Sequence, residues 1–257
     1  MNKSALITGA SSGIGEVFAR RLSAKGYRLI LVARRKDRLA ALAEELHNTE
    51  IIQADLSDAA DLRRIEDRID AEAGLEFLVN NAGFGVHGEF VEMPIESQDK
   101  MHRLHIIAIE RLTHAALRKM LKNRIGNIIN VSSVAGFTAT PYNVSYCATK
   151  TWINAFTEGL YLELKAIHSP VRIQALCPGF TRSEFHASAA MDIRMIPRSL
   201  WMSAEYVVER SLRGLEQNKL FVIPGWRYKL FTAIYPLVPR SIRHSLSTKY
   251  GRARREK

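Results

Sequence analysis

Thr8-Gly-Ala-Ser-Ser-Gly-Ile-Gly15 is the stretch that decides the fold. It follows a short apolar run, residues 5–8, and precedes a segment in which Val17, Phe18 and Leu22 are spaced as on a helix. A glycine-rich turn between a strand and a helix directs backbone N–H groups and the positive end of the helix dipole toward a phosphate. The stretch therefore predicts a strand–turn–helix unit that binds phosphate groups.

Seven short apolar runs alternate with helical patterns along the chain. The runs cover residues 5–8, 27–33, 51–54, 77–80, 127–132, 171–177 and 220–223. Such alternation is typical of a parallel sheet with helices on both faces. The chain has 257 residues, 47% of them hydrophobic, which is enough to bury a large core. We therefore expect an α/β fold: a single domain, 1–257, built on a doubly wound parallel sheet of about seven strands.

A second informative stretch carries Ser133, Tyr146 and Lys150. Two serines follow the apolar residues 128–131, and a helical pattern then places Tyr146 and Lys150 at i and i+4, on one helix face. Because an ammonium group favours the phenolate, Lys150 is expected to lower the tyrosine pKa from its ordinary value of about 10. The pair is a candidate acid/base that could protonate a substrate carbonyl oxygen. Ser133 is placed to hydrogen-bond that same oxygen. Alone, Tyr-x-x-x-Lys more often marks two half-exposed side chains.

Together these motifs resemble the short-chain dehydrogenase/reductase family. In the family's order and spacing they are Thr8-Gly-x-x-x-Gly-x-Gly15, Asn80-Asn-Ala-Gly83, Ser133, Tyr146-x-x-x-Lys150 and Pro178-Gly179. The resemblance covers residues 4 to about 185 well and the remainder loosely. It implies a Rossmann-type fold, with the cofactor and catalytic core in residues 1–183. It also implies hydride exchange between a nicotinamide cofactor and a carbonyl or secondary alcohol.

The resemblance also implies roles for individual residues. The catalytic residues would be Ser133, Tyr146 and Lys150: Tyr146 transfers the hydroxyl proton, Ser133 steadies the carbonyl oxygen, and Lys150 binds the nicotinamide ribose. Asp55 would hydrogen-bond the adenine. The expected cofactor-binding residues are Gly9, Ser11, Ser12, Gly13, Ile14, Gly15, Arg34, Arg35, Asp55, Asn81, Ala82, Gly83, Tyr146, Lys150, Pro178, Gly179 and Thr181.

Two arginines, Arg34 and Arg35, follow the second apolar run. Sites that prefer NAD place an Asp or Glu about 20 residues beyond the glycines to bind the ribose 2′-hydroxyl, and here Ala33 or Arg34 takes that position. A guanidinium suits the 2′-phosphate of NADP through charge-assisted hydrogen bonds. We expect NADP(H) to be preferred over NAD(H) through Arg34, with help from Arg35 and Ser12. Solvent-facing residues at a helix start would give the same pattern.

His105 is the clearest departure from the family pattern. It takes the place of an asparagine that usually completes a catalytic tetrad, largely through its backbone carbonyl, by holding a water. If the backbone carbonyl alone holds the water, histidine can take the place of asparagine. If the asparagine side chain is needed to brace the helix kink, the proton relay is impaired. His102 and His105, at i and i+3, also match the spacing of a metal pair. No third ligand suggests itself, and we expect no metal site.

Two long helical patterns indicate subunit contacts. Residues 99–122 are apolar nearly all round, which is typical of a helix buried on more than one side. The helix that carries Tyr146 has a further apolar stripe: Ile153, Phe156, Leu160, Leu164 and Ile167. In the family, the first of these helices packs against its counterpart in another subunit. We expect a homodimer or homotetramer assembled through both.

A competing motif overlaps the glycine-rich turn. Gly9-Ala-Ser-Ser-Gly13 also fits Gly-x-Ser-x-Gly, the nucleophile elbow of hydrolases, in which Ser11 would be the nucleophile. That elbow normally follows several strands, one of whose loops supplies an oxyanion donor, whereas here Gly9 follows the first apolar run of the chain. The context favours phosphate binding.

Positive charge is concentrated in residues 224–257, a basic C-terminal extension. The formal net charge is +11, and residues 225–257 hold nine Lys/Arg and one Glu, leaving +8 there. Aromatic residues alternate with the cations. Two interpretations remain: a lid or subunit contact, or an amphipathic segment in peripheral contact with a membrane. We expect no nucleic-acid partner.

Residues 184–202 are expected to form a flap over the substrate. Their apolar side chains, mixed with Asp192, Arg194 and Arg198, favour an apolar or amphipathic carbonyl or alcohol. No run approaches the roughly 20 apolar residues of a membrane span, and no apolar leader precedes the first strand, so we expect a cytoplasmic protein. Another class stays open: a non-catalytic NADP-sensing protein, or one associated with nucleic acid or a membrane, on the same fold.

Overall fold

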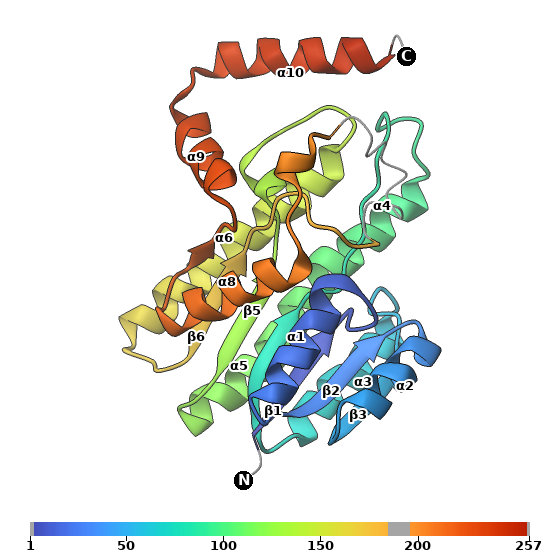
Figure 1. Cartoon of the computed structure of the whole chain (residues 1–257), viewed down its shortest axis with the longest axis vertical. Helices are drawn as coiled ribbons and strands as arrows, with labels where there is room; N and C mark the ends of the chain where they lie inside the picture. Colours follow the sequence, from blue (N-terminus) through green and yellow to red (C-terminus); the bar gives the residue numbers. More distant parts are fainter. Residues whose placement is uncertain (1–2, 185–195, 256–257) are drawn as a thin grey trace.

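The computed structural model describes residues 3–184 and 196–255. Its centre is a seven-stranded sheet in the order β3-β2-β1-β4-β5-β6-β7, in which all paired strands are parallel (Figure 1). The strands are β1 (Ser4–Thr8), β2 (Arg28–Ala33), β3 (Thr49–Gln53), β4 (Leu75–Asn80), β5 (Asn127–Val131), β6 (Arg172–Leu176) and β7 (Phe221–Val222). The predicted doubly wound parallel sheet is confirmed. Chain order reverses between β1 and β4, where such sheets open a crevice beyond the carboxyl ends of their strands.

Two layers of helices cover the sheet (Figure 1). One layer contains α1 (Gly13–Ala24), α2 (Lys36–Glu45) and α8 (Ala204–Glu216), and the other contains α3 (Ala59–Ala71), α5 (Ala108–Asn123) and α6 (Val144–Ala166). Successive residues of β1 point into opposite cores: Ile7 joins Phe18 in one core, and Leu6 joins Leu112 in the other. Each fully buried side chain of this size contributes about 1.5–3 kcal/mol. Apolar residues on both faces of the strands therefore specify the three-layer fold.

A π-helical turn divides the helical pattern over residues 99–122. The chain passes from α4 (Ile95–His102) through Arg103–Ile107 into α5. Single π-helical turns inside helices are frequent at functional sites. Here the turn directs His105 into the interior, where it is 0% exposed. The pattern is helical as predicted, but it is not one continuous α-helix.

The basic extension forms a helical arm. It consists of α9 (Trp226–Ile234), a 3-10 turn at Tyr235–Leu237 and α10 (Arg240–Arg255). Pro236 lies in the turn, where its ring prevents a continuous helix. Figure 1 shows the arm at the end of the molecule opposite the N-terminus, beyond the carboxyl ends of the strands. Within the described residues, no helix is both long and apolar enough to cross a membrane.

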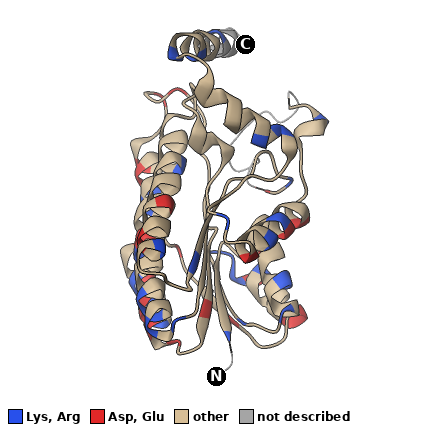
Figure 2. Ribbon diagram, turned by 90° about the vertical axis from the view of Figure 1, so that its left-hand side faces the viewer, with Lys and Arg blue, Asp and Glu red and all other residues tan. Residues whose placement is uncertain are grey.

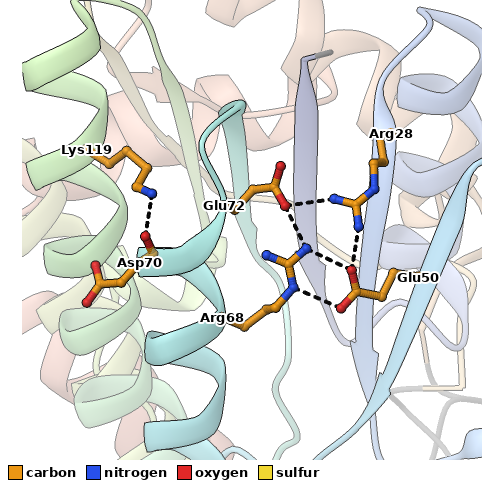
Figure 3. Close-up of polar contacts among 6 residues, drawn as sticks. All are labelled: Arg28, Glu50, Arg68, Asp70, Glu72 and Lys119. Carbon is orange, nitrogen blue, oxygen red and sulfur yellow. Dashed lines mark hydrogen bonds and ion pairs between the residues drawn. The ribbon is translucent and has the colours of Figure 1, made fainter. Parts of the chain in front are cut away.

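Four charged side chains fasten the edge strand β3 at the amino end of the sheet (Figure 3). Arg28 contacts Glu50 at 2.6 Å and Glu72 at 2.7 Å, and Arg68 contacts the same carboxylates at 2.8 and 2.6 Å. Hydrogen bonds from Arg68 are the main cause of the lowered pKa of Glu50. The network joins β2, β3 and α3 at the end of the sheet away from the crevice, so it supports the fold and leaves the crevice unobstructed.

Candidate active site

A cavity of about 580 Å³ lies at the carboxyl ends of β1, β4, β5 and β6. With one exception, all the residues predicted to bind the cofactor or to act in catalysis line this cavity. The exception is Gly15, which is buried in the first turn of α1. The structure therefore brings together motifs that lie as far apart in the sequence as Gly9 and Thr181.

The glycine-rich turn has the backbone shape that its sequence predicts. Gly9 and Gly13 have φ angles of +65° and +57°, in the left-handed region that favours glycine. α1 begins at Gly13, so its free N–H groups and the positive end of its dipole lie at the cavity. This cradle fits the pyrophosphate of a dinucleotide.

The Asn80–Gly83 motif is fastened to the same turn. The Thr8 hydroxyl accepts hydrogen bonds from the backbone N–H groups of Asn81 at 2.9 Å and Ala82 at 3.0 Å. The Asn81 amide donates to the carbonyl oxygens of Thr8 and Gly9 at 3.0 and 3.1 Å. A Cβ at Gly15 would lie 2.5 Å from the Asn81 Nδ2, so a larger residue would separate the two loops. The third glycine is thus required for packing.

Of the two candidate arginines for the 2′-phosphate, Arg35 faces the turn. Its guanidinium donates to the hydroxyls of Ser11 at 3.0 Å and Ser12 at 2.9 Å, and it pairs with Glu184 at 2.7 Å. Arg34 also lines the cavity, but its side chain is exposed. Arg35 is therefore a better candidate for the 2′-phosphate contact than Arg34, which the sequence favoured. The Ser11 hydroxyl accepts its hydrogen bonds from a guanidinium, which cannot act as the base of a hydrolase.

Asp55 lies at the far side of the cavity, after β3. Its carboxylate accepts hydrogen bonds from Ser57 at 2.6 Å and pairs with Lys100 at 2.9 Å. Burial by itself raises the pKa of Asp55, but the hydrogen bonds from Ser57 and Lys100 outweigh this effect and the net pKa is lowered. The side chain is therefore an ionised acceptor, suited to an amino group such as that of adenine. The N-cap of α3 is Asp58, whose side chain accepts hydrogen bonds from the N–H groups of Ala60 and Asp61.

Ser133, Tyr146 and Lys150 meet at the end of β5. The Lys150 Nζ donates to the carbonyl oxygen of Val131 at 2.9 Å and lies 5.6 Å from the centre of the Tyr146 ring. Burial lowers the pKa of Lys150 to about 8. Burial also raises the pKa of Tyr146, and a hydrogen bond with Ser133 opposes this effect. The net pKa of Tyr146 is therefore raised, and not lowered as expected, because desolvation of the phenol dominates.

His105 joins the loop at Phe84 to α6, the helix that carries Tyr146 and Lys150. Its Nε2 accepts from the N–H of Phe84 at 3.2 Å, which leaves the proton on Nδ1, 3.0 Å from the Thr149 hydroxyl. Thr149 in turn donates to the carbonyl oxygen of Tyr146 at 2.9 Å. Burial, with the charges of Lys150 and His102, holds the His105 pKa well below its usual range, so the ring is neutral. The imidazole thus links the π-helical turn to the loop at Phe84 and to α6.

Comparison with known proteins shows the family to which the chain belongs. A family model described as short chain dehydrogenase matches residues 3–193. The chain belongs to the short-chain dehydrogenase family. It is therefore an NAD(P)-dependent oxidoreductase acting on CH–OH or C=O groups.

Individual members of the family are similar over most of their length. A short-chain dehydrogenase from Sphingobium yanoikuyae, solved in complex with NADPH, is 34% identical with a TM-score of 0.83, covering 91% of this chain and 93% of that one. A bulky-bulky ketone specific alcohol dehydrogenase from Comamonas testosteroni is 32% identical with a TM-score of 0.78, covering 93% and 95%. The 3-oxoacyl-[acyl-carrier-protein] reductase FabG from Aquifex aeolicus is 31% identical over 75% of this chain and 79% of its own length.

In this chain, a residue that belongs to none of the motifs also supports the cavity. Tyr228, from α9, accepts a hydrogen bond from the N–H of Phe180 at 3.1 Å and donates to the carbonyl oxygen of Leu200 at 2.7 Å. A Cβ at Gly179 would collide with its ring. The arm thus holds the Pro178–Thr181 wall of the cavity. The only sequence signal for this contact was the aromatic content of the extension.

The predicted flap of the dehydrogenase is described in part. Residues 185–195 lie outside the described residues. The remainder contains a short 3-10 helix, Arg198–Leu200, and the Trp201 ring, 5.7 Å from that of Phe180. Among the described residues, no cluster of three His, Cys, Asp or Glu side chains could hold a metal ion.

Proposed function

We propose that the chain is an NADP(H)-dependent carbonyl reductase/alcohol dehydrogenase for apolar or amphipathic substrates. The observation that carries the proposal is the meeting of Tyr146, Ser133 and Lys150 with the phosphate cradle and Arg35 in one cavity. Similarity to a dehydrogenase solved with NADPH supports the cofactor assignment. When bound, the nicotinamide would supply or accept the hydride.

The side chains of the site fit acid catalysis at a carbonyl oxygen. Because its pKa is raised, Tyr146 carries its proton at neutral pH and is in the form that donates to that oxygen. Ser133 would hydrogen-bond the same oxygen and orient it. Lys150, with a pKa of about 8, keeps its positive charge at neutral pH and would stabilise negative charge on the tyrosine as the proton leaves.

The walls of the cavity favour a substrate with apolar surface. Val86, Phe180 and Phe231 line the same cavity as the catalytic side chains. Burial of apolar substrate surface against such residues supplies binding energy, while the few polar groups set orientation. Likeness to a dehydrogenase described as specific for bulky ketones supports the same substrate class.

We also propose a homodimer or homotetramer. In the single chain, large apolar residues are exposed next to α5 and on α6. Ile107, the last residue of the π-helical turn before α5, is 43% exposed, and Leu162, on α6, is 58% exposed. Self-association through these helices would cover both.

The decisive experiment is oxidation of NADPH and NADH by the purified protein with a panel of aldehydes, ketones, steroids and 3-oxoacyl thioesters. Turnover that is faster with NADPH and is lost in Tyr146→Phe supports the proposal. Turnover that Tyr146→Phe leaves intact contradicts the mechanism. If NADPH binds tightly and no carbonyl compound reacts, the non-catalytic sensor becomes the better interpretation.

A further inference from the structure

The C-terminal arm, residues 226–255, has one side docked on the domain. Tyr228 and Thr232 are buried there, and the Tyr142 hydroxyl donates to the carbonyl oxygen of Gly251 at 3.0 Å. These contacts fix the orientation of α9 and α10 relative to the cavity. The opposite side of the arm therefore faces outward in a defined direction.

The outward side is apolar to an unusual degree. Its large hydrophobic side chains are between 49% and 81% exposed: Trp226, Leu230, Ile234, Leu237, Ile242 and Leu246. Scattered exposed hydrophobic residues are normal, but a series of them along one segment marks an interaction surface. Tryptophan in particular is enriched where protein meets the lipid headgroups.

Cations accompany these side chains, and carboxylates do not. Residues 226–255 contain eight Lys/Arg and no Asp or Glu. Figure 2 shows Lys and Arg without Asp or Glu on the two helices at the top of the molecule. Arg227 lies 5.3 Å from the Trp226 ring, and Arg243 lies 5.0 Å from the Tyr235 ring. Hydrophobic residues interleaved with cations are the pattern of segments that lie in the headgroup region of anionic membranes.

The same charges argue against a second copy of the chain as the occupant. A two-fold interface places one patch against itself, so the cations of one arm would meet those of its partner. That contact has no carboxylates within the arm to offset the repulsion. An anionic bilayer satisfies the cations and the apolar side chains together.

The arm also reaches the active-site cavity. Phe231, on α9, lines the cavity and is 42% exposed. We propose that the outward side of the arm binds an anionic membrane surface and so turns the cavity toward the lipid. The part of this inference that concerns substrate rests on the proposed function: an amphipathic carbonyl compound would enter from the bilayer past Phe231.

Co-sedimentation of the whole protein with vesicles tests the proposal. We expect binding to phosphatidylcholine/phosphatidylglycerol vesicles at low salt, and much weaker binding to pure phosphatidylcholine. Arg240→Gln/Arg243→Gln/Lys249→Gln should weaken anionic binding about 100-fold. Leu230→Ser/Leu237→Ser/Leu246→Ser should weaken it at least about tenfold. Thermal melts confirm that the variants fold; Tyr228, which docks the arm, is left unchanged.

Matched controls use exposed residues away from the arm. Arg21→Gln/Arg172→Gln/Lys219→Gln removes as many cations, and Ile125→Ser/Tyr206→Ser removes exposed apolar side chains. None of these residues lies on α5 or α6, and both variants should bind as the unaltered protein does. Failure of the unaltered protein to bind anionic vesicles at low salt would overturn the proposal. Equal loss in the controls would overturn it too, as would an arm variant that turns a dimer into a monomer without affecting vesicle binding. Vesicle binding without NADPH turnover would contradict the proposed function and leave the membrane site standing.

Discussion

The carboxylate of Glu184 lies 2.7 Å from the guanidinium of Arg35, which also hydrogen-bonds the Ser11 and Ser12 hydroxyls. Arg38 contacts the same carboxylate at 2.5 Å. Hydrogen bonds from Arg38 and Arg35 lower the pKa of Glu184 to about 2, so it is ionised at all ordinary pH values. The Glu184 carboxylate is therefore paired with the guanidinium that we propose to bind the 2′-phosphate. The carboxylate and the phosphate must compete for Arg35.

Glu184→Gln should accordingly strengthen NADPH binding. Because the pair is exposed and screened by solvent, the expected gain is modest, about two- to fivefold in Kd. NADH, which lacks the 2′-phosphate, should bind as before. Fluorescence titration with both cofactors measures the difference. Glu209→Gln, which removes a similarly exposed partner of Arg213, is the control. Unchanged NADPH affinity would show that Glu184 does not compete.

Arg35→Ala should weaken NADPH binding more than Arg34→Ala does. A charge-assisted hydrogen bond contributes about 1.5–3 kcal/mol, so we expect a loss of about 10- to 100-fold for Arg35. NADH affinity should change little in either variant. Titration of both variants with both cofactors gives the comparison. A larger loss of NADPH affinity in Arg34→Ala would show that Arg34, the residue that the sequence favoured, contacts the 2′-phosphate.

His105→Leu should lower kcat and stability together. It leaves the N–H of Phe84 without its acceptor and the Thr149 hydroxyl without its imidazole partner, at a cost of about 1–3 kcal/mol. His105→Asn keeps a polar group there and should recover part of both. Urea unfolding and steady-state kinetics measure the two effects. If only stability falls and kcat is unchanged, His105 has no role in positioning Tyr146.

Lys150→Met should abolish most activity while stabilising the fold at neutral pH. Burial lowers the folded-state pKa of Lys150 to about 8 from an ordinary 10.5, so the folded protein binds its proton less tightly than the unfolded chain does. Below pH 8 this costs the folded state up to about 3 kcal/mol. The cost shrinks as pH rises from 8 to 10.5. The melting temperature of Lys150→Met should therefore exceed that of the unaltered protein at pH 7, and the gap should narrow at pH 10; a constant gap would contradict this.

Arg68→Gln should destabilise the protein in a pH-dependent way. Both partners of Arg68, Glu50 and Glu72, have pKa values below their ordinary 4.5, so their pairing stabilises the fold above that pH. The stabilisation is lost as pH falls through the lowered folded-state values. We expect a loss of about 1–2 kcal/mol at pH 7 that disappears in strong acid, measured by urea unfolding. A deficit of the same size at low pH would mean that Arg68 acts through packing alone.

Local sequence determined the fold class and most of the site. The left-handed φ angles of Gly9 and Gly13 follow from their lack of a side chain, and the alternation of apolar runs with helical patterns specifies a covered parallel sheet. Once the sheet is parallel, the motifs that follow its strands must meet at one edge. Ser133, Tyr146 and Lys150 could therefore be placed beside the phosphate cradle from their order in the chain.

Tertiary structure decided the features that depend on burial and on contacts between distant segments. Whether Arg34 or Arg35 faces the turn depends on a single residue of register at the end of β2, which composition does not reveal. The pKa of Tyr146 rises because desolvation outweighs its neighbours, and desolvation exists only once the chain is packed. The support of Phe180 by Tyr228 spans 48 residues, so no local pattern could have indicated it.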